Sequence, residues 1–411
     1  MLHPRRLLFV VLIAAITTET GAGITLFLLS RVRASRFSVP REHFLDRVAD
    51  IDEQRLRQRS EEDTYDAVLG WRNAPGSARV LVNSAGHEWT IHYDLDGARH
   101  DPVSAPDALI ATFGASFTQC DEVDDDETWQ HYLTPLATTH VANFGVGAYG
   151  PDQSVLLLER KLEAGLATPI IVLTLHEENI NLIVNRYRPY YQPHDPMTLG
   201  FKPRFILREG ELELLANPLI LDRRANKPIA DHLAEAAQDD YWFEYNAQRP
   251  RVSFPFTYQL SKLILDVAIE KRMITANPLA SLPRNLWAEP SAVRLMTALV
   301  RRFVETSRRH RATPVLFLLP EIGDAGRWRS DRARYRAWLD EIRTDLEGEG
   351  LRVVDMAESI VDPEHFRVGV DQGHASPEAN RSIARALLPT LRPLVDRVRE
   401  HGNRPEARAR D

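Results

Sequence analysis

The chain has 411 residues, of which 44% are hydrophobic and 27% are charged, and its formal net charge is −7. This is the composition of a globular protein with enough apolar residues for a sizeable core, and it excludes a disordered or collagen-like chain. The mild acidity gives no reason to expect a nucleic-acid partner. The single cysteine, Cys120, excludes a disulfide within the chain, and we interpret it as a small buried side chain.

The N-terminus carries an apolar run from Leu7 to Leu29 that is long enough to cross a bilayer. Glu19 near its middle would cost about 3 kcal/mol, which the surrounding Leu, Ile, Val and Phe outweigh. We therefore predict that residues 1–34 form a membrane anchor. A signal peptide cut after Ala22 is the alternative, although the apolar run continues past that point. Glu19 is either a contact for a membrane partner or a protonated or snorkelling side chain.

Residues 35–105 are predicted to form a juxtamembrane stalk and a small β lead-in. The stalk is charged and compatible with helix, whereas residues 67–99 alternate apolar and polar positions between Gly and Asn turns, which indicates two or three short strands. At the other end of the chain, residues 399–411 have the polar composition of a disordered tail.

From residue 106 onward, strands alternate with helices. The sequence predicts apolar strands at 108–113, 139–144, 169–175, 313–319 and 351–355, and helices at 126–137, 152–165, 291–310, 329–347 and 377–388. Continuous apolar strands separated by helices predict an α/β fold, a three-layer α/β/α domain over 106–398 with a mainly parallel five-stranded sheet. Functional sites in such sheets form beyond the carboxyl ends of the strands.

An insertion at about 181–290 interrupts this alternation. It is rich in Pro, Tyr, Trp and Phe, and a hairpin is predicted at 203–216. Such an aromatic insertion either shapes a substrate cleft or covers the sheet as a structural lid.

A serine stands at the end of the first predicted strand of this domain, in the stretch "IATFGASFTQCDEV" over residues 110–123. Gly114 and Ala115 before it are too small to shield Ser116, which therefore has the geometry of a nucleophile. A serine nucleophile also needs a base, a group that orients the base, and donors for an oxyanion.

The stretch "VDQGHASPEANRSIARALL" near the C-terminus supplies a base. Asp371 and His374 are spaced so that a carboxylate can reach one imidazole nitrogen while the other nitrogen faces a substrate. The alternative is a helix-capping segment built on Ser376 and Pro377, which does not account for Asp371 and His374.

Two further loops supply candidate donors. The glycine-rich loop Asn143–Gln153 exposes backbone N–H groups that either hold an anion or belong to an ordinary strand-to-helix turn. Asn179, after the third strand, either presents its amide to the same point or caps a turn.

These four segments, in this order, resemble the SGNH, or GDSL-type, hydrolase family. The resemblance implies that Ser116 is the nucleophile and that His374 is the general base, oriented by Asp371. It also implies an oxyanion hole formed by the backbone N–H of Ser116, the loop at Gly147 and Ala148, and the side chain of Asn179. The segments "LGWRN", "NFGVGAYG" and "HEENINLIVNRYRPYY" look like those of membrane-anchored bacterial members.

The sequence departs from the family pattern at three places. Gly-Ala-Ser replaces Gly-Asp-Ser, Ala148 stands where a glycine is usual, and Asn179 follows Glu178 in place of a glycine and precedes Ile180 in place of an aspartate. Because a carboxylate near a forming oxyanion opposes catalysis, Glu177 and Glu178 are expected to point away or to bind another group.

We expect no metal and no cofactor. The acidic run "CDEVDDDE" over 120–127 is interpreted as the solvated start of a helix. "HEEN" over 176–179 lacks the second histidine of a zinc motif, because residue 180 is Ile.

By resemblance, the chain is expected to be a serine esterase that works through an acyl-enzyme, with water or another hydroxyl as acceptor. Its expected substrates are O-acylated glycans or similar esters, and its place is the bacterial inner membrane, with a single span and the catalytic domain outside the cytoplasm. The alternative hypothesis is an inactive, membrane-tethered module of a polysaccharide assembly, whose aromatic insertion binds glycan by stacking.

Overall fold

The computed structural model describes residues 4–31, 40–49, 64–83, 86–103, 107–192, 200–219, 228–276, 286–319, 335–359 and 374–402. At its centre lies a five-stranded sheet in the order β11-β10-β7-β5-β6, in which all neighbours are parallel. Its strands are β5 (Ile110–Gly114), β6 (Val141–Gly145), β7 (Ile170–His176), β10 (Thr313–Leu319) and β11 (Arg352–Asp355). The predicted α/β fold with a parallel five-stranded sheet is confirmed.

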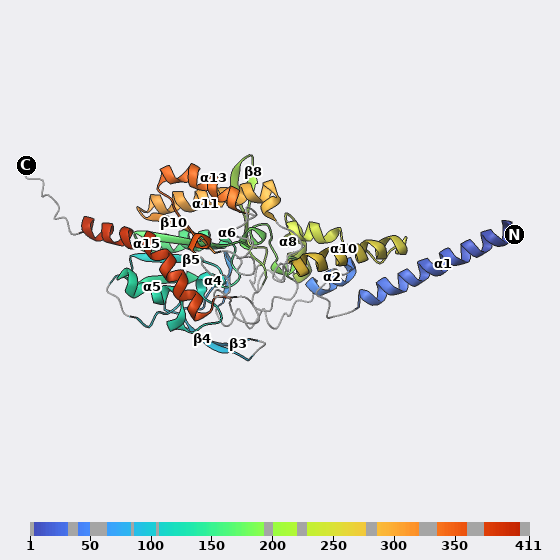
Figure 1. Cartoon of the computed structure of the whole chain (residues 1–411), viewed down its shortest axis with the longest axis horizontal. Coiled ribbons are helices and arrows are strands. Elements are labelled where there is room, and N and C mark those ends of the chain that lie inside the picture. Colours follow the sequence, from blue (N-terminus) through green and yellow to red (C-terminus); the bar gives the residue numbers. More distant parts are fainter. Residues whose placement is uncertain are drawn as a thin grey trace, which may run out of the picture.

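Helices cover both faces of this sheet, which is why its strands are continuously apolar. One face packs against α5 (Trp129–Ala137) and α15 (Pro377–Gly402), which share one hydrophobic cluster with the sheet. The other face packs against α6 (Pro151–Glu163), α11 (Pro290–Arg309) and α13 (Arg336–Leu346). Figure 1 shows the two helix layers on opposite sides of the strands.

Two predicted helices have different bounds in the structure. The helix expected at 126–137 begins at Trp129, because Thr128 caps it by accepting a hydrogen bond from the His131 N–H. A short 3-10 turn, η1 (Asp125–Glu127), precedes it. The helix expected at 377–388 continues to Gly402 through Pro389 and Pro393. Packing of its apolar face against α5 outweighs the cost of the two prolines there.

The β lead-in and the hairpin of the insertion are present as predicted. The lead-in contains β1 (Tyr65–Asp66), β2 (Gly70–Trp71), β3 (Ala78–Val82) and β4 (Glu88–His92), and the hairpin consists of β8 (Arg204–Arg208) and β9 (Glu211–Leu215). The remaining elements are α1 (Pro4–Leu29), α2 (Arg41–Ala49), α4 (Ser116–Gln119), α7 (Asn179–Leu182), η2 (Arg188–Tyr190), α8 (Ile229–Ala237), α9 (Tyr241–Ala247), α10 (Phe256–Ala276), η3 (Leu286–Ala288), η5 (Glu347–Glu349) and α14 (Met356–Ser359).

Most large aromatic side chains in the described part of the insertion are buried in the core or pack against it. Tyr187, Tyr190, Phe201 and Trp242 belong to the same hydrophobic cluster as α6 and α11. Lys202 reaches from the insertion to α6, where its Nζ lies 2.5 Å from a carboxylate oxygen of Asp152, and both side chains are almost fully buried. The described residues of the insertion that precede α10 are therefore part of the domain core.

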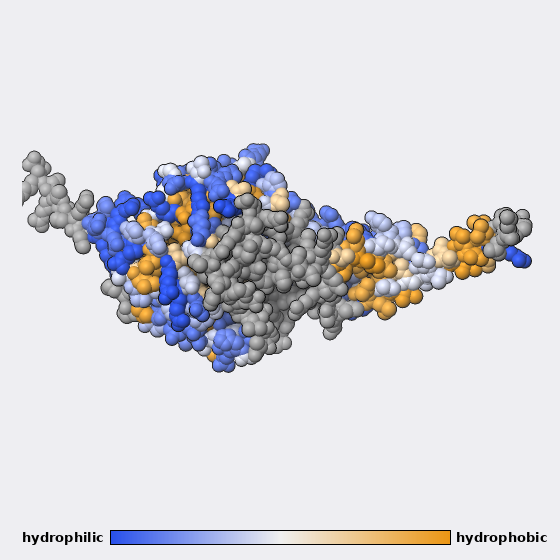
Figure 2. Space-filling view, viewed as in Figure 1, coloured by the Kyte–Doolittle hydropathy of each residue, from blue (hydrophilic) through white to orange (hydrophobic). Residues whose placement is uncertain are grey.

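The N-terminal helix α1 stands apart from this core. Its segment Arg6–Leu29 is long and apolar enough to cross a membrane, a property that it shares with signal sequences. Figure 2 shows apolar surface along this helix, which projects from one end of the molecule.

Candidate active site

Ser116 opens the short helix α4 directly after β5, at the carboxyl edge of the sheet. Glycines allow this placement. A Cβ on Gly114 would lie 2.1 Å from Thr118 Oγ1, and one on Gly145 would lie 2.1 Å from the Gln119 nitrogen. Because real Cβ atoms do not approach so closely, only glycine lets α4 rest on the ends of β5 and β6. The small residues around Ser116 thus bring the hydroxyl to the rim of the sheet.

The imidazole of His374 meets this hydroxyl. Its Nε2 lies 2.8 Å from Ser116 Oγ, although 258 residues separate the two in the chain. His374 immediately precedes the N-terminus of α15, where Ser376 Oγ accepts a hydrogen bond from the Ala379 N–H at 3.2 Å. The segment therefore caps a helix and also places a histidine against Ser116, so both interpretations of this stretch apply.

A carboxylate that the sequence analysis did not single out faces the other ring nitrogen. Glu122 Oε2 lies 3.5 Å from His374 Nδ1, and its side chain is 5% exposed. His374 Nδ1 has no hydrogen-bond partner among the described residues, so Glu122 is its nearest counter-charge. The expected orienting group, Asp371, lies outside the described residues. The interpretation of residues 120–127 as a solvated helix start is wrong for Glu122, which is buried.

The two side chains favour each other's charged form. Burial lowers the pKa of His374, but the neighbouring Glu122 carboxylate and the charge of Asp121 outweigh it, so the pKa is raised from its usual value. Burial raises the pKa of Glu122, but the neighbouring His374 imidazole leaves it lowered. A proton held on Nδ1 toward Glu122 leaves the lone pair of Nε2 for the Ser116 hydroxyl. This tautomer is the one a general base requires.

Arg99 holds the loop that carries Glu122. Its fully buried guanidinium lies 3.0 Å from Asp125 Oδ1. It also donates hydrogen bonds to the main-chain oxygens of Gln119 (2.7 Å), Cys120 (2.5 Å) and Val123 (2.6 Å). Cys120 and Glu122 have left-handed backbone angles, with φ of 61° and 68°. Such conformations persist where surrounding contacts enforce them, and Arg99 supplies these contacts.

Two other acidic residues of this run bind the β lead-in. Asp124 accepts a hydrogen bond from the Thr90 N–H at 2.8 Å, and Asp125 pairs with His92 at 2.7 Å, so both bind the edge of β4. Cys120 is 2% exposed, which confirms the interpretation of a buried side chain. Burial raises the pKa of its thiol to about 12, so it stays protonated and is a poor nucleophile.

The loop after β6 presents free backbone donors. Trp71 Nε1 donates to the Gly147 carbonyl at 2.9 Å, and Arg188 donates to the Ala148 carbonyl at 3.3 Å. In a trans peptide the N–H points opposite to the preceding carbonyl, so Trp71 directs the Ala148 N–H away from itself. Within the described residues, neither Gly147 N–H nor Ala148 N–H has a hydrogen-bond acceptor. Ala148 adopts a φ of 64°, a strained value at the position where a glycine is usual.

Asn179 is fixed by its oxygen. Its Oδ1 accepts a hydrogen bond from the His176 N–H at 2.7 Å, and its amide NH2 has no acceptor in the described part of the chain. The neighbouring carboxylate is engaged elsewhere, because Glu178 Oε1 accepts hydrogen bonds from Tyr191 OH and Gln192 Nε2, each at 3.1 Å. The expectation that Glu178 binds another group is confirmed.

A second imidazole lines the site. His176, at the end of β7, stacks on Phe117 with the ring centres 4.3 Å apart, and Phe117 lies 5.0 Å from the His374 ring. Burial, with a smaller effect of the charge on His374, lowers the pKa of His176 to about 3, so the ring is neutral. Over the residues that the structure describes, no group of three His, Cys, Asp or Glu side chains is arranged to hold a metal.

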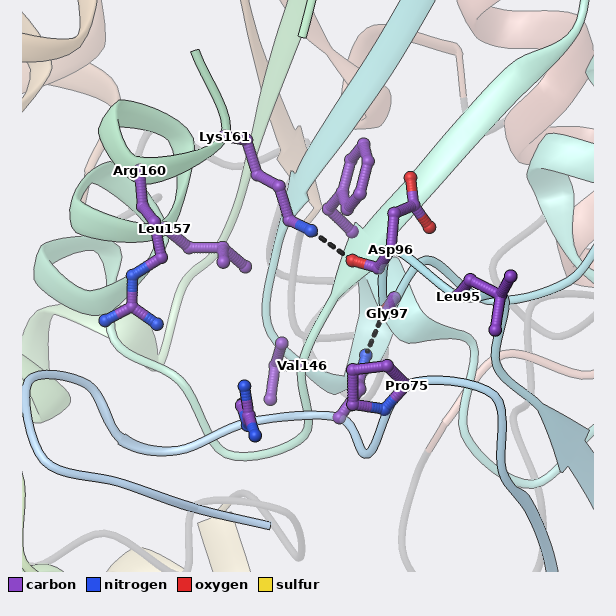
Figure 3. A pocket seen from close by; sticks show the side chains of 11 residues that line it. Pro75, Leu95, Asp96, Gly97, Val146, Leu157, Arg160 and Lys161 are labelled. Carbon is purple, nitrogen blue, oxygen red and sulfur yellow. Dashed lines mark hydrogen bonds between the residues drawn. The ribbon is translucent and has the colours of Figure 1, made fainter. Parts of the chain in front are cut away.

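A separate pocket of about 210 Å³ lies behind the loop after β6. It is lined by Phe144, Val146 and Leu157 and by the basic residues Arg72, Arg160 and Lys161. Figure 3 shows Lys161 reaching the backbone carbonyl of Asp96 across this pocket. Arg160 forms a bidentate ion pair with Asp66. Ser116 and His374 are not among the lining residues, so this pocket is distinct from the candidate active site.

Comparison with known proteins gives distant structural neighbours. No family model and no curated protein matches the chain. A G-D-S-L family protein from Desulfitobacterium hafniense DCB-2 has a TM-score of 0.30 and 9% identity, with 68% of this chain and 97% of that one covered. A member of the lipolytic G-D-S-L family from Veillonella parvula DSM 2008 has a TM-score of 0.33 and 9% identity, with 68% and 96% covered. At these scores the likeness carries no argument about function.

Proposed function

We propose that the chain is a serine ester hydrolase of the SGNH type. The observation that carries the proposal is the contact of 2.8 Å between Ser116 Oγ and His374 Nε2 at the carboxyl edge of the parallel sheet, with Glu122 on the far side of the ring. A hydroxyl, an imidazole and a carboxylate in this order are the parts that serine hydrolases of unrelated folds share.

In the proposed reaction, Ser116 Oγ attacks the ester carbonyl carbon while its proton passes to His374 Nε2. The tetrahedral intermediate collapses, the bond to the leaving oxygen breaks, and that oxygen takes the proton from His374. Water, or an acceptor hydroxyl, then attacks the acyl-enzyme with His374 again as base. Hydrolysis and acyl transfer share this course up to the acyl-enzyme.

The oxyanion would be held by donors that have no other acceptor within the described residues. The backbone N–H of Ser116, those of Gly147 and Ala148, and the amide of Asn179 meet this condition. Donors that are already fixed in place stabilise developing charge without reorganisation. Trp71 and Arg188, which hold the two carbonyls of the loop, act as positioning residues.

The substrate class and location follow from the resemblance and the N-terminal helix. We propose that α1 remains as a single membrane anchor and that the catalytic domain acts on O-acylated glycans or similar esters outside the cytoplasm. The rival hypothesis of an inactive glycan-binding module needs exposed aromatic rings in the insertion. Tyr187, Tyr190, Tyr191 and Trp242 are at most 7% exposed, and the exposed rings of the insertion, Phe254 and Tyr258, stand at the start of α10, which packs on α1, so this favours the enzyme.

The test uses the full chain in detergent, with p-nitrophenyl acetate as substrate. Ser116→Ala is expected to lower kcat by about 10⁵–10⁶-fold, as removal of a nucleophile does in serine hydrolases. Ser382→Ala, which changes a half-buried serine on α15, is the matched control and should retain full activity. A fluorophosphonate should label Ser116, as read by mass spectrometry. Equal rates for wild type and Ser116→Ala, with no label, would refute the enzyme hypothesis.

A further inference from the structure

Helix α10 exposes large apolar side chains. Phe254 just before it, and Tyr258, Ile264 and Leu265 within it, are 74%, 63%, 61% and 59% exposed. Tyr258 and Leu265 are seven residues apart and lie on one face of α10, Ile264 lies beside Leu265, and Phe254 precedes the helix. Exposed apolar side chains gathered in this way mark an interaction surface.

This surface adjoins the apolar surface of α1. Ala22 and Leu26 are the buried side chains on the inner side of α1, and a Cβ on Gly23 would lie 3.2 Å from the ring of Phe256. The two helices contact each other along the second half of α1. Figures 1 and 2 show them projecting together from the same end of the molecule.

Glu19 joins the two helices by capping α10. Its carboxylate accepts hydrogen bonds from the N–H of Phe256 at 2.7 Å and of Thr257 at 3.3 Å, and from the Thr257 hydroxyl. The first N–H groups of a helix have no partner within it, and leaving them bare costs several kcal/mol each in hydrocarbon. A carboxylate in an apolar helix is equally costly when alone. Each group thus satisfies the other, and Glu19 has a partner within its own chain.

We propose that the N-terminal part of α10 is immersed in the bilayer beside α1, with lipid covering the face formed by Phe254, Tyr258, Ile264 and Leu265. This inference rests on the proposed membrane anchor. Glu19 precedes the end of α1 at Leu29 by ten residues, which places the start of α10 roughly 15 Å from that end. If α1 spans the membrane, Phe256 lies well inside the hydrocarbon region, whose thickness is about 30 Å.

The polar side chains of α10 are compatible with a position inside the bilayer. Lys262 extends its Nζ to the carbonyl of Gln248, so its charge is directed to the folded domain and away from the tip. Ser261 returns its hydroxyl to the Thr257 carbonyl within the helix, as serine does in membrane helices. The segment before α10 is fixed to α2, because the Val252 N–H donates to Glu42 at 3.1 Å. The domain and the membrane helices are therefore held in one orientation.

Lipid contact is measured on the full chain in phosphatidylcholine vesicles. Phe254→Cys and Tyr258→Cys are labelled with an NBD fluorophore, and Cys120 stays unlabelled because it is buried. Val80→Cys, on an equally exposed apolar residue of β3, is the water-facing control, and Leu12→Cys on α1 is the lipid-facing control. Doxyl-labelled lipid should remove most of the emission at positions 254, 258 and 12 and leave that at 80 unchanged.

Iodide quenching at 254 and 258 without doxyl quenching would overturn the inference, and so would protection from both quenchers, which would indicate a second copy of the chain or another protein on this face. The control at position 12 distinguishes failure of the α10 proposal from failure of the membrane anchor. Doxyl quenching at 12 alone would contradict the role of α10 and leave the anchor in place. Loss of quenching at 12 would contradict the anchor itself, while ester hydrolysis is assayed independently.

The cap is tested by hydrogen exchange in the same vesicles. Glu19→Leu should give roughly fivefold faster exchange at the amides of Phe256 and Thr257, the factor expected from loss of one helix cap. Glu19→Gln keeps an acceptor oxygen and should remain close to wild type. Equal exchange in the Leu and Gln variants would contradict the capping role.

Discussion

The carboxyl edge of the sheet and the α1–α10 pair are both built around a carboxylate, but the two carboxylates are held differently. Glu122 sits on a loop whose main chain is clamped by Arg99 through three carbonyls and kept in left-handed conformations. Glu19 stands in a regular helix and meets a second helix through its side chain alone. The first arrangement fixes an orientation, whereas the second satisfies polar groups that would otherwise be bare.

This difference matches what the two proposals require of each region. A general base must be held within a few tenths of an ångström, because small displacements of catalytic groups cost rate. A membrane-facing helix pair needs only closed hydrogen bonds and apolar contact with lipid. We therefore expect changes at the catalytic edge to have large and specific effects on rate, and changes at α1–α10 to affect membrane association.

The largest expected effect within this comparison comes from the carboxylate beside His374. Glu122→Gln removes the charge that favours the reactive tautomer and should lower kcat on p-nitrophenyl acetate by about 10³–10⁴-fold, as loss of the orienting acid does in other triads. Asp371→Asn is the matched variant for the alternative that the family resemblance implies, and it should cost much less. The reverse order of the two effects would assign the orienting role to Asp371.

The pH dependence of the same variant is a second test of Glu122. Because the pKa of His374 is raised, the acid limb of kcat/KM in wild type should lie above 6.5, the ordinary value for histidine. The base works only when neutral, so activity falls below that pKa. Glu122→Gln removes the main cause of the increase, and the limb should move to lower pH. If the residual activity of Glu122→Gln falls at the same pH as in wild type, Glu122 does not act on His374.

Motifs in the sequence predicted Ser116 and His374, which meet at the edge of the sheet, but not the groups that hold them. The strands could be predicted because buried parallel strands are continuously apolar, and Ser116 and His374 stand next to elements with clear start signals. Glu122 lies within an acidic run whose average character is that of a solvated surface. Arg99 follows a Gly-containing turn, well before Ser116 in the chain. Their roles depend on contacts between segments, and nothing local marks them.

Glu19 shows the same limit at the other end of the molecule. The sequence indicated an acidic residue that required an explanation, because its cost in an apolar helix is known. Its partners at Phe256 and Thr257 are 237 and 238 residues away, inside a segment predicted only as an aromatic insertion. The sequence left open a partner contact and a protonated or snorkelling side chain, and the fold shows partners within the same chain.

The next largest effect is expected at Arg99. Arg99→Met leaves three buried carbonyls without their donor, and loss of a buried charge beside Asp125 adds to this, so the free energy of unfolding should fall by about 3–5 kcal/mol. Arg99→Lys keeps the charge but cannot reach the three carbonyls together, and should fall between Met and wild type. Chemical denaturation measures both. At temperatures where the variants are folded, kcat should still be reduced on the order of tenfold or more, because the Glu122 loop is released.

An Arg99→Met protein with normal kcat would mean that the loop keeps its shape without the clamp. The strained angles at Cys120 and Glu122 would then be supported by the packing of α4 alone. A fall in stability without a fall in rate is thus the outcome that separates a structural arginine from a positioning one.

The smallest expected effect lies where the two regions meet. Tyr187 OH donates to the Val48 carbonyl of α2 at 3.1 Å, and the next residue, Arg188, holds the Ala148 carbonyl of the proposed oxyanion loop. Tyr187→Phe removes one hydrogen bond and should lower the free energy of unfolding by about 1 kcal/mol. It should leave kcat/KM within about twofold, because the Arg188 N–H remains bound to the Gly200 carbonyl at 2.7 Å.

Arg188→Met, which releases the loop, should lower kcat/KM on the order of tenfold or more. If Tyr187→Phe lowered kcat/KM as much as Arg188→Met, the membrane-proximal helices and the catalytic edge would be one mechanical unit, and the separation drawn between them would be wrong.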